Sequence, residues 1–294
     1  MAFGGHETFA VREGWLARGL DLLTHAPQLL SDEFSEDHLG VGRNMAKSIR
    51  YWLRATGLCT DGRADDSLVP TALARLIAKR DPHFLDSGTW WALHINLIND
   101  ASSAFAWNWF FNHWAIARFD RAPCVEGLRR HATSTLARTP TQRTLDREVA
   151  ALLQTYSAQV PPTPDDPEDS GESPFQDLQL LFHFRATGYY QLNFDPKPIP
   201  PGVFGYAIAS CCAAAPRCDF TIAELERTPS GPGRAFLLRG DELLDLVTEF
   251  ESTDRKLFSL RSQAGERAIH TPPKLTALDW MKVHYERSPA NANA

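Results

Sequence analysis

Apolar residues recur at helical spacing in the N-terminal part of the chain, and the clearest case also carries a basic face. In residues 39–58, the apolar residues Met45, Ile49, Trp52 and Leu53 fall at positions i, i+4, i+7 and i+8 of one helix face. Like charges one turn apart repel each other on a helix, yet a second face of this segment is entirely positive. We therefore expect that face to bind an anionic partner, and a nucleic acid is the first candidate. The residues of the basic face are Arg43, Lys47, Arg50 and Arg54.

The segments on either side of the basic helix predict a winged helix-turn-helix. Residues 10–30 have the apolar spacing of an amphipathic helix, and a short acidic segment follows. Residues 57–69 contain two short extended stretches around an Asp-Gly pair, which is typical of a β-hairpin. A further helix is expected from Pro70 to Lys79. Helix, helix, basic helix and hairpin is the order of a winged helix-turn-helix, whose third helix enters the major groove of DNA.

Polar side chains beside the basic positions are candidates for reading bases. Asn44 and Ser48 each follow directly after a basic residue, so they are predicted to reach base edges while the cations hold phosphates. A later helix is predicted to begin at Thr139 as N-cap, with Pro140 and Gln142 in its first turn. Its exposed charges fit either a second recognition helix or an ordinary surface helix with salt bridges. The predicted DNA-binding residues are Arg12, Arg43, Asn44, Lys47, Ser48, Arg50, Tyr51, Arg54, Arg143 and Arg147.

The chain as a whole is acidic, which limits how it can bind DNA. Its 294 residues include 36 acidic and 30 basic side chains, for a formal net charge of −6. Contact with DNA must therefore come from local patches. With 43% hydrophobic and 22% charged residues, the chain has the composition of a globular protein. No stretch of about 18 apolar residues and no signal peptide is apparent, so we expect no membrane contact and a cytoplasmic location.

The five cysteines form no disulfide-like framework, which is typical of a reducing compartment. Cys211, Cys212 and Cys218 could be considered as zinc ligands, but no CxxC pair is present and the surrounding residues are small and apolar. Buried thiols in a packed helix are the favoured interpretation.

Two further segments each allow two interpretations. The aromatic residues within 88–117 could form a stacking platform for unpaired bases, but their mixed spacing favours core packing, with His94 and His113 as core histidines. The acidic, proline-rich residues 160–174 could bind Mg²⁺, but their composition favours a linker.

Together these patterns predict a mainly α (α+β) protein with several regions. The expected regions are a winged helix-turn-helix-like DNA-binding part (1–80), a helical region packed on it (81–159), the linker (160–174), a smaller C-terminal α/β domain (175–288), and a disordered tail (289–294).

The segment FGGHETF near the N-terminus is the strongest candidate for chemistry, because nucleophile elbows, P-loops, dinucleotide fingerprints and HExxH motifs are absent. His6 could act as a general base, Glu7 could bind a metal, and Arg12 could hold a phosphate. The alternative is a well-ordered turn in which His6 and Glu7 satisfy backbone groups.

Several separate motifs, in this order, resemble a known bacterial family. They are FGGHETFAVREGWL (3–16), LGVGRNMAKSIRYWLRATGL (39–58), DPHFLDSGTWWALHINL (81–97), TLDREVAALLQTYS (144–157) and EDSGESPFQDLQLL (168–181). This family, long catalogued as a domain of unknown function, is similar to the SspB component of single-stranded DNA phosphorothioation systems. The resemblance implies a DNA nickase that opens one strand so that sulfur-transfer and ATPase partner proteins can insert sulfur for phage defence.

The leading prediction is therefore a nickase that acts on double-stranded DNA, with His6 and Glu7 as catalytic candidates. Mg²⁺ or another divalent cation is expected from the reaction class alone. One alternative is a non-catalytic winged-helix regulator, or an adaptor that recruits the sulfur-transfer partners. Another is a protein-interaction role in which the basic helix faces an acidic partner. The sequence leaves the oligomeric state open, a homodimer included.

Overall fold

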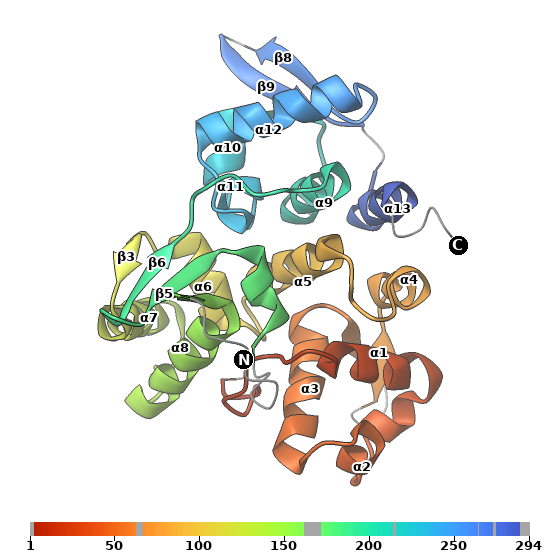
Figure 1. Cartoon of the computed structure of the whole chain (residues 1–294), viewed down its shortest axis with the longest axis vertical. Coiled ribbons are helices and arrows are strands. Elements are labelled where there is room, and N and C mark those ends of the chain that lie inside the picture. The colour runs from red at the N-terminus through yellow and green to blue at the C-terminus, as the bar shows by residue number, and fades with distance from the viewer. Residues whose placement is uncertain are drawn as a thin grey trace. The chain divides into compact units, whose positions relative to one another are not determined.

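The computed structural model describes residues 3–62, 67–161, 172–213, 216–263, 265–272 and 275–288. The chain divides into two compact units, Met1–Asn193 and Phe194–Ala294. Each unit combines helices with a small sheet, and helices predominate (Figure 1). The predicted mainly α, α+β class is confirmed.

The first unit begins with a cluster of helices that ends in a short antiparallel strand pair. The apolar face predicted for residues 39–58 forms as expected, because Ile49, Trp52 and Leu53 of α3 are fully buried. Two strands follow in the region where the hairpin was predicted, and Cys59 pairs with Pro70. The elements are α1 (Trp15–His25), η1 (Pro27–Leu30), α2 (Ser35–Leu39), α3 (Arg43–Ala55), β1 (Cys59–Asp61), β2 (Leu68–Pro70) and α4 (Ala72–Arg80).

Four further helices carry the aromatic core of this unit. Trp107, Phe110, Phe111 and Tyr156 are all buried, which confirms core packing of the aromatic region. His94 is also buried, and its Nδ1 lies 2.7 Å from the Tyr156 hydroxyl. The helices are α5 (Ser87–Asn99), α6 (Phe105–His113), α7 (Arg121–Thr135) and α8 (Gln142–Tyr156).

Two predictions in this region need correction. His113 is not a core histidine: it is exposed at the end of α6 and stacks on His131 with ring centroids 4.8 Å apart. The helix predicted to begin at Thr139 begins at Gln142 instead, because Thr141 is the N-cap and its Oγ1 accepts from the Thr144 N–H at 3.2 Å.

A buried carboxylate organises the loop that precedes α5. Asp81 Oδ1 accepts from the Leu85 N–H at 2.8 Å, and Oδ2 accepts from the Asp86 N–H at 3.1 Å and from Thr89 Oγ1 at 2.6 Å. Asp86 in turn caps α5 by accepting from the Gly88 N–H at 2.8 Å. The aspartates of the DPHFLDSGT motif therefore act on the backbone of their own loop.

A four-stranded sheet completes the first unit, and the boundary between the units lies later in the chain than predicted. The strand order is β3-β6-β5-β4, in which β4 and β5 are parallel and the other pairs are antiparallel. Because β5 and β6 pair with strands from before the proline-rich segment, the unit extends to Asn193 rather than ending at 160–174. Residues 162–171 of that segment lie outside the described residues. The elements are β3 (Arg118–Phe119), β4 (Ser157–Val160), η2 (Pro174–Leu178), β5 (Leu181–Phe184) and β6 (Tyr189–Leu192).

The second unit has its own aromatic core. Gly205 of α9 packs so closely on Trp280 of α13 that a Cβ would lie 2.1 Å from the indole ring. Phe204, Phe250 and Phe258 pack against one another beside this contact. The predicted tail after Ser288 lies outside the described residues. The elements are α9 (Pro201–Cys211), β7 (Asp219–Thr221), α10 (Ile222–Arg227), α11 (Pro232–Ala235), α12 (Gly240–Thr253), β8 (Ser259–Gln263), β9 (Glu266–His270) and α13 (Ala277–Arg287), with strand order β7-β9-β8.

The cysteines differ in burial between the two units. Cys59 and Cys124 are buried, and burial raises the pKa of each thiol to about 12. Cys211, Cys212 and Cys218 are only half-buried, which is less than predicted, and the Sγ atoms of the first two lie 3.5 Å apart. All five are free thiols.

Candidate nucleic-acid interface

The segment FGGHETF forms a loop that is held between α3 and α8 of the first unit (Figure 1). The Gly4 N–H donates to Oε1 of Glu148 on α8 at 2.5 Å, and His6 Nε2 lies 3.1 Å from the same oxygen. On the other side, Glu7 Oε1 lies 3.8 Å from Nζ of Lys47 on α3. The loop turns sharply, with φ of +77° at Gly4 and +49° at Glu7.

His6 is the anchor of this loop. Its Nδ1 accepts from the Thr8 N–H at 3.0 Å, so its Nε2 carries the proton that is shared with Glu148. Its side chain is 0% exposed and meets the rings of Tyr51 and Trp107 edge-on, with centroids 5.7 Å away in each case. Of the two interpretations, His6 therefore has the structural one: it satisfies a backbone group, and it does not face solvent as a general base must.

Two residues predicted to contact DNA are buried instead. Ser48 is 0% exposed, and its Oγ has no hydrogen-bond partner among the described residues. Tyr51 is also buried, donates to the Ser103 carbonyl at 3.2 Å, and packs on Gly5, where a Cβ would lie 2.6 Å from the ring. Burial raises the Tyr51 pKa well above its ordinary value. The predictions for Ser48 as a base reader and Tyr51 as a DNA contact are therefore wrong, because one step along a helix turns a side chain by about 100°.

The remaining residues of α3 that were predicted to contact DNA fall into two groups. Arg43, Asn44 and Lys47 are exposed near the start of the helix, whose first turn has no acidic residue. Arg50 and Arg54 are half-buried and hold neighbouring elements: Arg50 donates to the Leu30 carbonyl at 3.0 Å, and Arg54 Nε donates to Asp61 Oδ1 at 2.8 Å. The exposed part of the basic face is therefore shorter than predicted.

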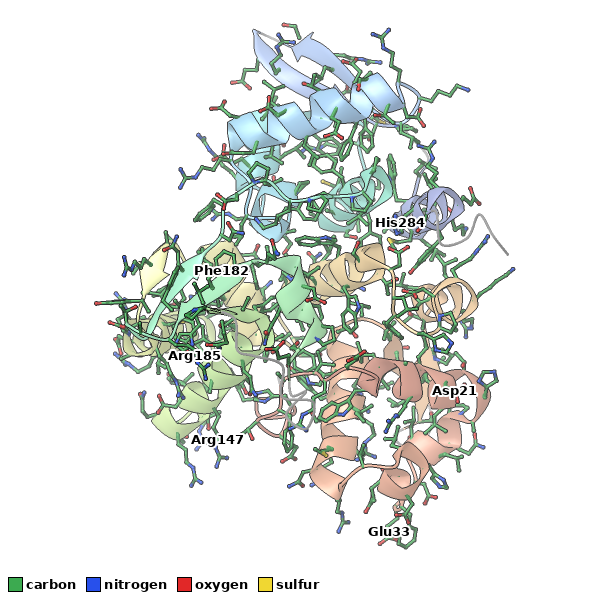
Figure 2. All side chains as sticks on the ribbon, in the orientation of Figure 1. Asp21, Glu33, Arg147, Phe182, Arg185 and His284 are labelled. Atoms are coloured by element: carbon green, nitrogen blue, oxygen red, sulfur yellow. The ribbon has the colours of Figure 1, made fainter. Side chains whose placement is uncertain are left out.

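Helix α8 presents two more exposed cations, Arg143 and Arg147, which lie one turn apart in the helix. Arg147 is labelled in Figure 2. Among the described residues neither forms an ion pair, and both interpretations of this helix, recognition helix and ordinary surface helix, stay predictions. Arg12 differs from them. Its guanidinium is half-buried over the rings of Phe9 and Trp15, at 5.6 and 5.7 Å from their centroids.

Sequence reasoning missed Glu148, which joins the loop to α8. The signal was present in the pattern: Glu148 is a charged residue among the buried positions Leu145, Val149 and Leu152. A carboxylate on the apolar face of a helix needs a hydrogen-bonding partner. Its partner could not be identified from the sequence, because His6 lies 142 residues away.

The described residues contain no group of three or more His, Cys, Asp or Glu side chains that could hold a metal ion. Glu7 is the only carboxylate of the loop, and its side chain is 35% exposed. Within the described parts of the chain, no helix is long and apolar enough to cross a membrane.

This fold and loop belong to a defined class of proteins. A family model described as a protein of unknown function (DUF4007) matches residues 3–285, so the chain belongs to that family. No curated protein matches the chain. Two crystal structures of SspB, one of them with bound magnesium ion, have a similar fold. Each is 25% identical to this chain, covers 98% of it and 90% of its own length, and has a TM-score of 0.85. The predicted resemblance to the SspB family is confirmed.

Proposed function

We propose that this protein is a DNA-binding component of a phosphorothioation system and that it nicks one strand of double-stranded DNA. The likeness to SspB along nearly the whole chain is the observation that carries the proposal. The exposed cations on α3 and α8 support it, because an acidic chain needs such local patches to hold phosphates. In this proposal α1 to β2 form a winged helix-turn-helix, with α3 in the major groove and the β1–β2 pair as the wing.

The exposed residues have distinct roles in this proposal. Arg43 and Lys47 on α3, with Arg143 and Arg147 on α8, hold phosphates, and Asn44 reaches a base edge. Glu7 lies beside one of these cations, with its Oε1 3.8 Å from Nζ of Lys47. His6 positions Glu7 and is not a catalytic residue, because its ring is buried and both of its nitrogens are engaged.

A divalent cation fits this arrangement only if it is shared with DNA. One of the similar SspB structures holds a magnesium ion. Mg²⁺ is commonly bound through one or two carboxylates together with phosphate oxygens and water, and Glu7 offers one half-buried carboxylate. When bound there, the cation would supply charge stabilisation at the phosphate. We propose that Glu7 is its protein ligand.

Supercoiled plasmid incubated with the full chain, with and without Mg²⁺, tests this function. We expect open-circular product only with Mg²⁺, and we expect Glu7→Gln to abolish it. Glu13→Gln is the matched control, because Glu13 is an exposed glutamate a few residues along that contacts neither helix cation. No open-circular DNA in either condition would overturn nicking, and it would favour the non-catalytic regulator or adaptor.

DNA affinity measured as a function of salt concentration tests the proposed role of α3 separately. Arg43→Gln combined with Lys47→Gln should weaken binding and reduce the log–log salt slope by about 0.9 for each lost phosphate contact. Arg75→Gln with Lys79→Gln is the matched control, because it removes the same two residue types at the same spacing from the exposed side of α4. An equal effect of both pairs would refute a specific role for α3.

A further inference from the structure

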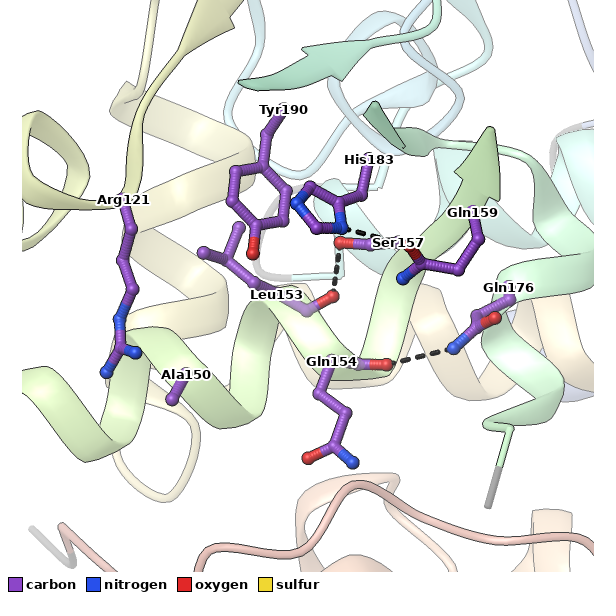
Figure 3. A pocket seen from close by; sticks show the side chains of 9 residues that line it. All are labelled: Arg121, Ala150, Leu153, Gln154, Ser157, Gln159, Gln176, His183 and Tyr190. Atoms are coloured by element: carbon purple, nitrogen blue, oxygen red, sulfur yellow. Dashed lines mark hydrogen bonds between the residues drawn. The ribbon is translucent and has the colours of Figure 1, made fainter. Parts of the chain in front are cut away.

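A pocket of about 250 Å³ lies beside α8, between that helix and the four-stranded sheet (Figure 3). One wall is formed by Tyr190, His183 and Gln159 from the sheet, and the facing side by Ala150 and Leu153 of α8. The volume is near the lower limit of ordinary small-molecule pockets, about 300 Å³. The pocket therefore suits a ligand no larger than one nucleotide.

The three residues of the sheet wall belong to a single row of paired side chains that runs across the four strands, with Phe119 of β3 beside the pocket lining. Phe119 of β3 pairs with Tyr190 of β6, Tyr190 with His183 of β5, and His183 with Gln159 of β4. The rings are stacked along this row, with centroids 5.8 Å apart for Phe119 and Tyr190 and 4.4 Å apart for Tyr190 and His183. Because the ring faces are occupied by each other, a ligand must meet their edges.

The edges that remain are uncharged hydrogen-bonding groups. His183 Nδ1 donates to Gln159 Oε1 at 3.0 Å, which leaves the imidazole Nε2 as an acceptor and the Gln159 amide NH₂ as a donor. Burial, together with the Arg185 charge, lowers the His183 pKa, which favours the neutral form of the ring. The Tyr190 hydroxyl has no partner among the described residues. Donors and acceptors that alternate in this way match the edges of nucleobases.

The only charge in the pocket lining is positive. Arg121 stands at one end of the pocket, opposite Gln159 and Gln176, and donates to the Asp146 carbonyl at 2.7 Å (Figure 3). No acidic side chain lines the pocket. An anion at this end would therefore meet no repulsion from the lining, and the guanidinium suits a phosphate.

The same face of α8 connects this pocket to the proposed DNA-binding cations. Arg143, Arg147, Ala150 and Gln154 fall at positions i, i+4, i+7 and i+11, so they form one stripe along the helix. Each four-residue step advances about 6 Å along the axis. A strand whose phosphates lie on the two arginines would therefore reach the pocket with its next nucleotides.

We propose that this pocket binds one unpaired nucleotide, with its base against the Tyr190–His183–Gln159 row and its phosphate at Arg121. The proposal rests on the DNA-binding function proposed above, and it specifies which part of the DNA strand contacts the first unit beside α8. Proteins that act on a base extrude its nucleotide from the duplex into a pocket of this kind.

Calorimetric titration of the full chain with the four deoxynucleoside 5′-monophosphates tests the pocket without any DNA. Deoxyribose 5-phosphate serves as the base-free probe. We expect at least one nucleotide to bind ten times more tightly than the sugar phosphate, and Tyr190→Phe to weaken that nucleotide at least threefold. Tyr189→Phe is the matched control, because Tyr189 is the preceding residue of the strand and faces the opposite side of the sheet.

Arg121→Gln should weaken both the nucleotide and the sugar phosphate, whereas Arg130→Gln, on an exposed turn of the same helix, should change neither. The proposal is overturned if no nucleotide binds better than the sugar phosphate, or if Tyr190→Phe and Tyr189→Phe behave alike. Plasmid nicking and the α3 variants report separately on the proposed function. If DNA binding and nicking are normal but no nucleotide binds, the proposal for the pocket is refuted and the proposed function stands.

Discussion

The buried contact between Glu148 and the N-terminal loop gives the most direct test of how the interface is assembled. Replacing Glu148 with alanine removes the one oxygen that accepts from both the Gly4 N–H and the His6 ring. Both side chains of the pair are almost fully buried, at 0% exposure for His6 and 4% for Glu148. The His6 ring therefore has no contact with bulk solvent in the folded loop.

The expected cost follows from those two donors. A buried donor left without a partner costs about 1–3 kcal/mol, and Glu148→Ala leaves two donors without their acceptor, the Gly4 N–H and the His6 Nε2–H. We expect Glu148→Ala to lower the free energy of unfolding by about 4 kcal/mol. Glu148→Gln retains a carbonyl acceptor at the same place and should cost about 1–2 kcal/mol.

Urea denaturation and amide hydrogen exchange of residues 3–9 measure the effect together. If the loop detaches without global unfolding, the loss of stability is capped at the free energy of that local opening, and exchange of the loop amides reports it. Glu126→Ala is the control, because Glu126 makes only exposed ion pairs on α7 and should cost under about 1 kcal/mol. The reasoning is refuted if Glu148→Ala matches this control in stability and leaves loop exchange unchanged.

Three further predictions follow from single contacts. Gly5→Ala places a Cβ against the Tyr51 ring and should lower the midpoint of urea unfolding, at a cost of about 1–3 kcal/mol; an unchanged midpoint contradicts the close packing. Asp81→Ala leaves three donors without an acceptor and should lower the melting temperature more than Asp37→Ala does on the exposed surface of α2. Equal losses of melting temperature would refute the role of Asp81 in holding its loop. Hydrogen bonds from Lys282 and Thr276 lower the Asp279 pKa to about 2. Since the unfolded value is about 3.9, the stabilisation by Asp279 is full above about pH 4 and lost as pH falls to about 2. Asp279→Asn should flatten the fall of stability across that range, and parallel curves for both proteins would exclude the effect.

Local patterns in the sequence predicted local structure well. The buried side of α3 was predicted correctly through Ile49, Trp52 and Leu53, and the following strands and the aromatic core lie where the spacing placed them. These features depend on neighbours within one or two turns of helix, which periodicity records. The error at Ser48 arose at the edge of the polar face, where spacing alone does not separate an exposed side chain from a buried one.

Features that depend on distant partners were not accessible in the same way. The division after Asn193 results from β5 and β6 pairing with β3 and β4, and no local signal marks that pairing. Arg50 and Arg54 read as free cations until their partners in η1 and β1 are known. The pocket is equally non-local, because the row of side chains that lines it is drawn from three strands, β4, β5 and β6.

Helix α8 contacts several parts of the first unit, so these parts should move together when the helix shifts. One side of it holds the loop through Glu148, another presents Arg143 and Arg147, and Ala150 and Leu153 line the pocket. Tyr156 ends the helix and Ser157 begins β4 with no intervening loop. No flexible loop therefore separates the C-terminal end of α8 from the sheet, and the helix cannot shift without moving β4. If DNA binds as proposed and shifts the arginines of α8, the loop anchor and the pocket wall should move with them.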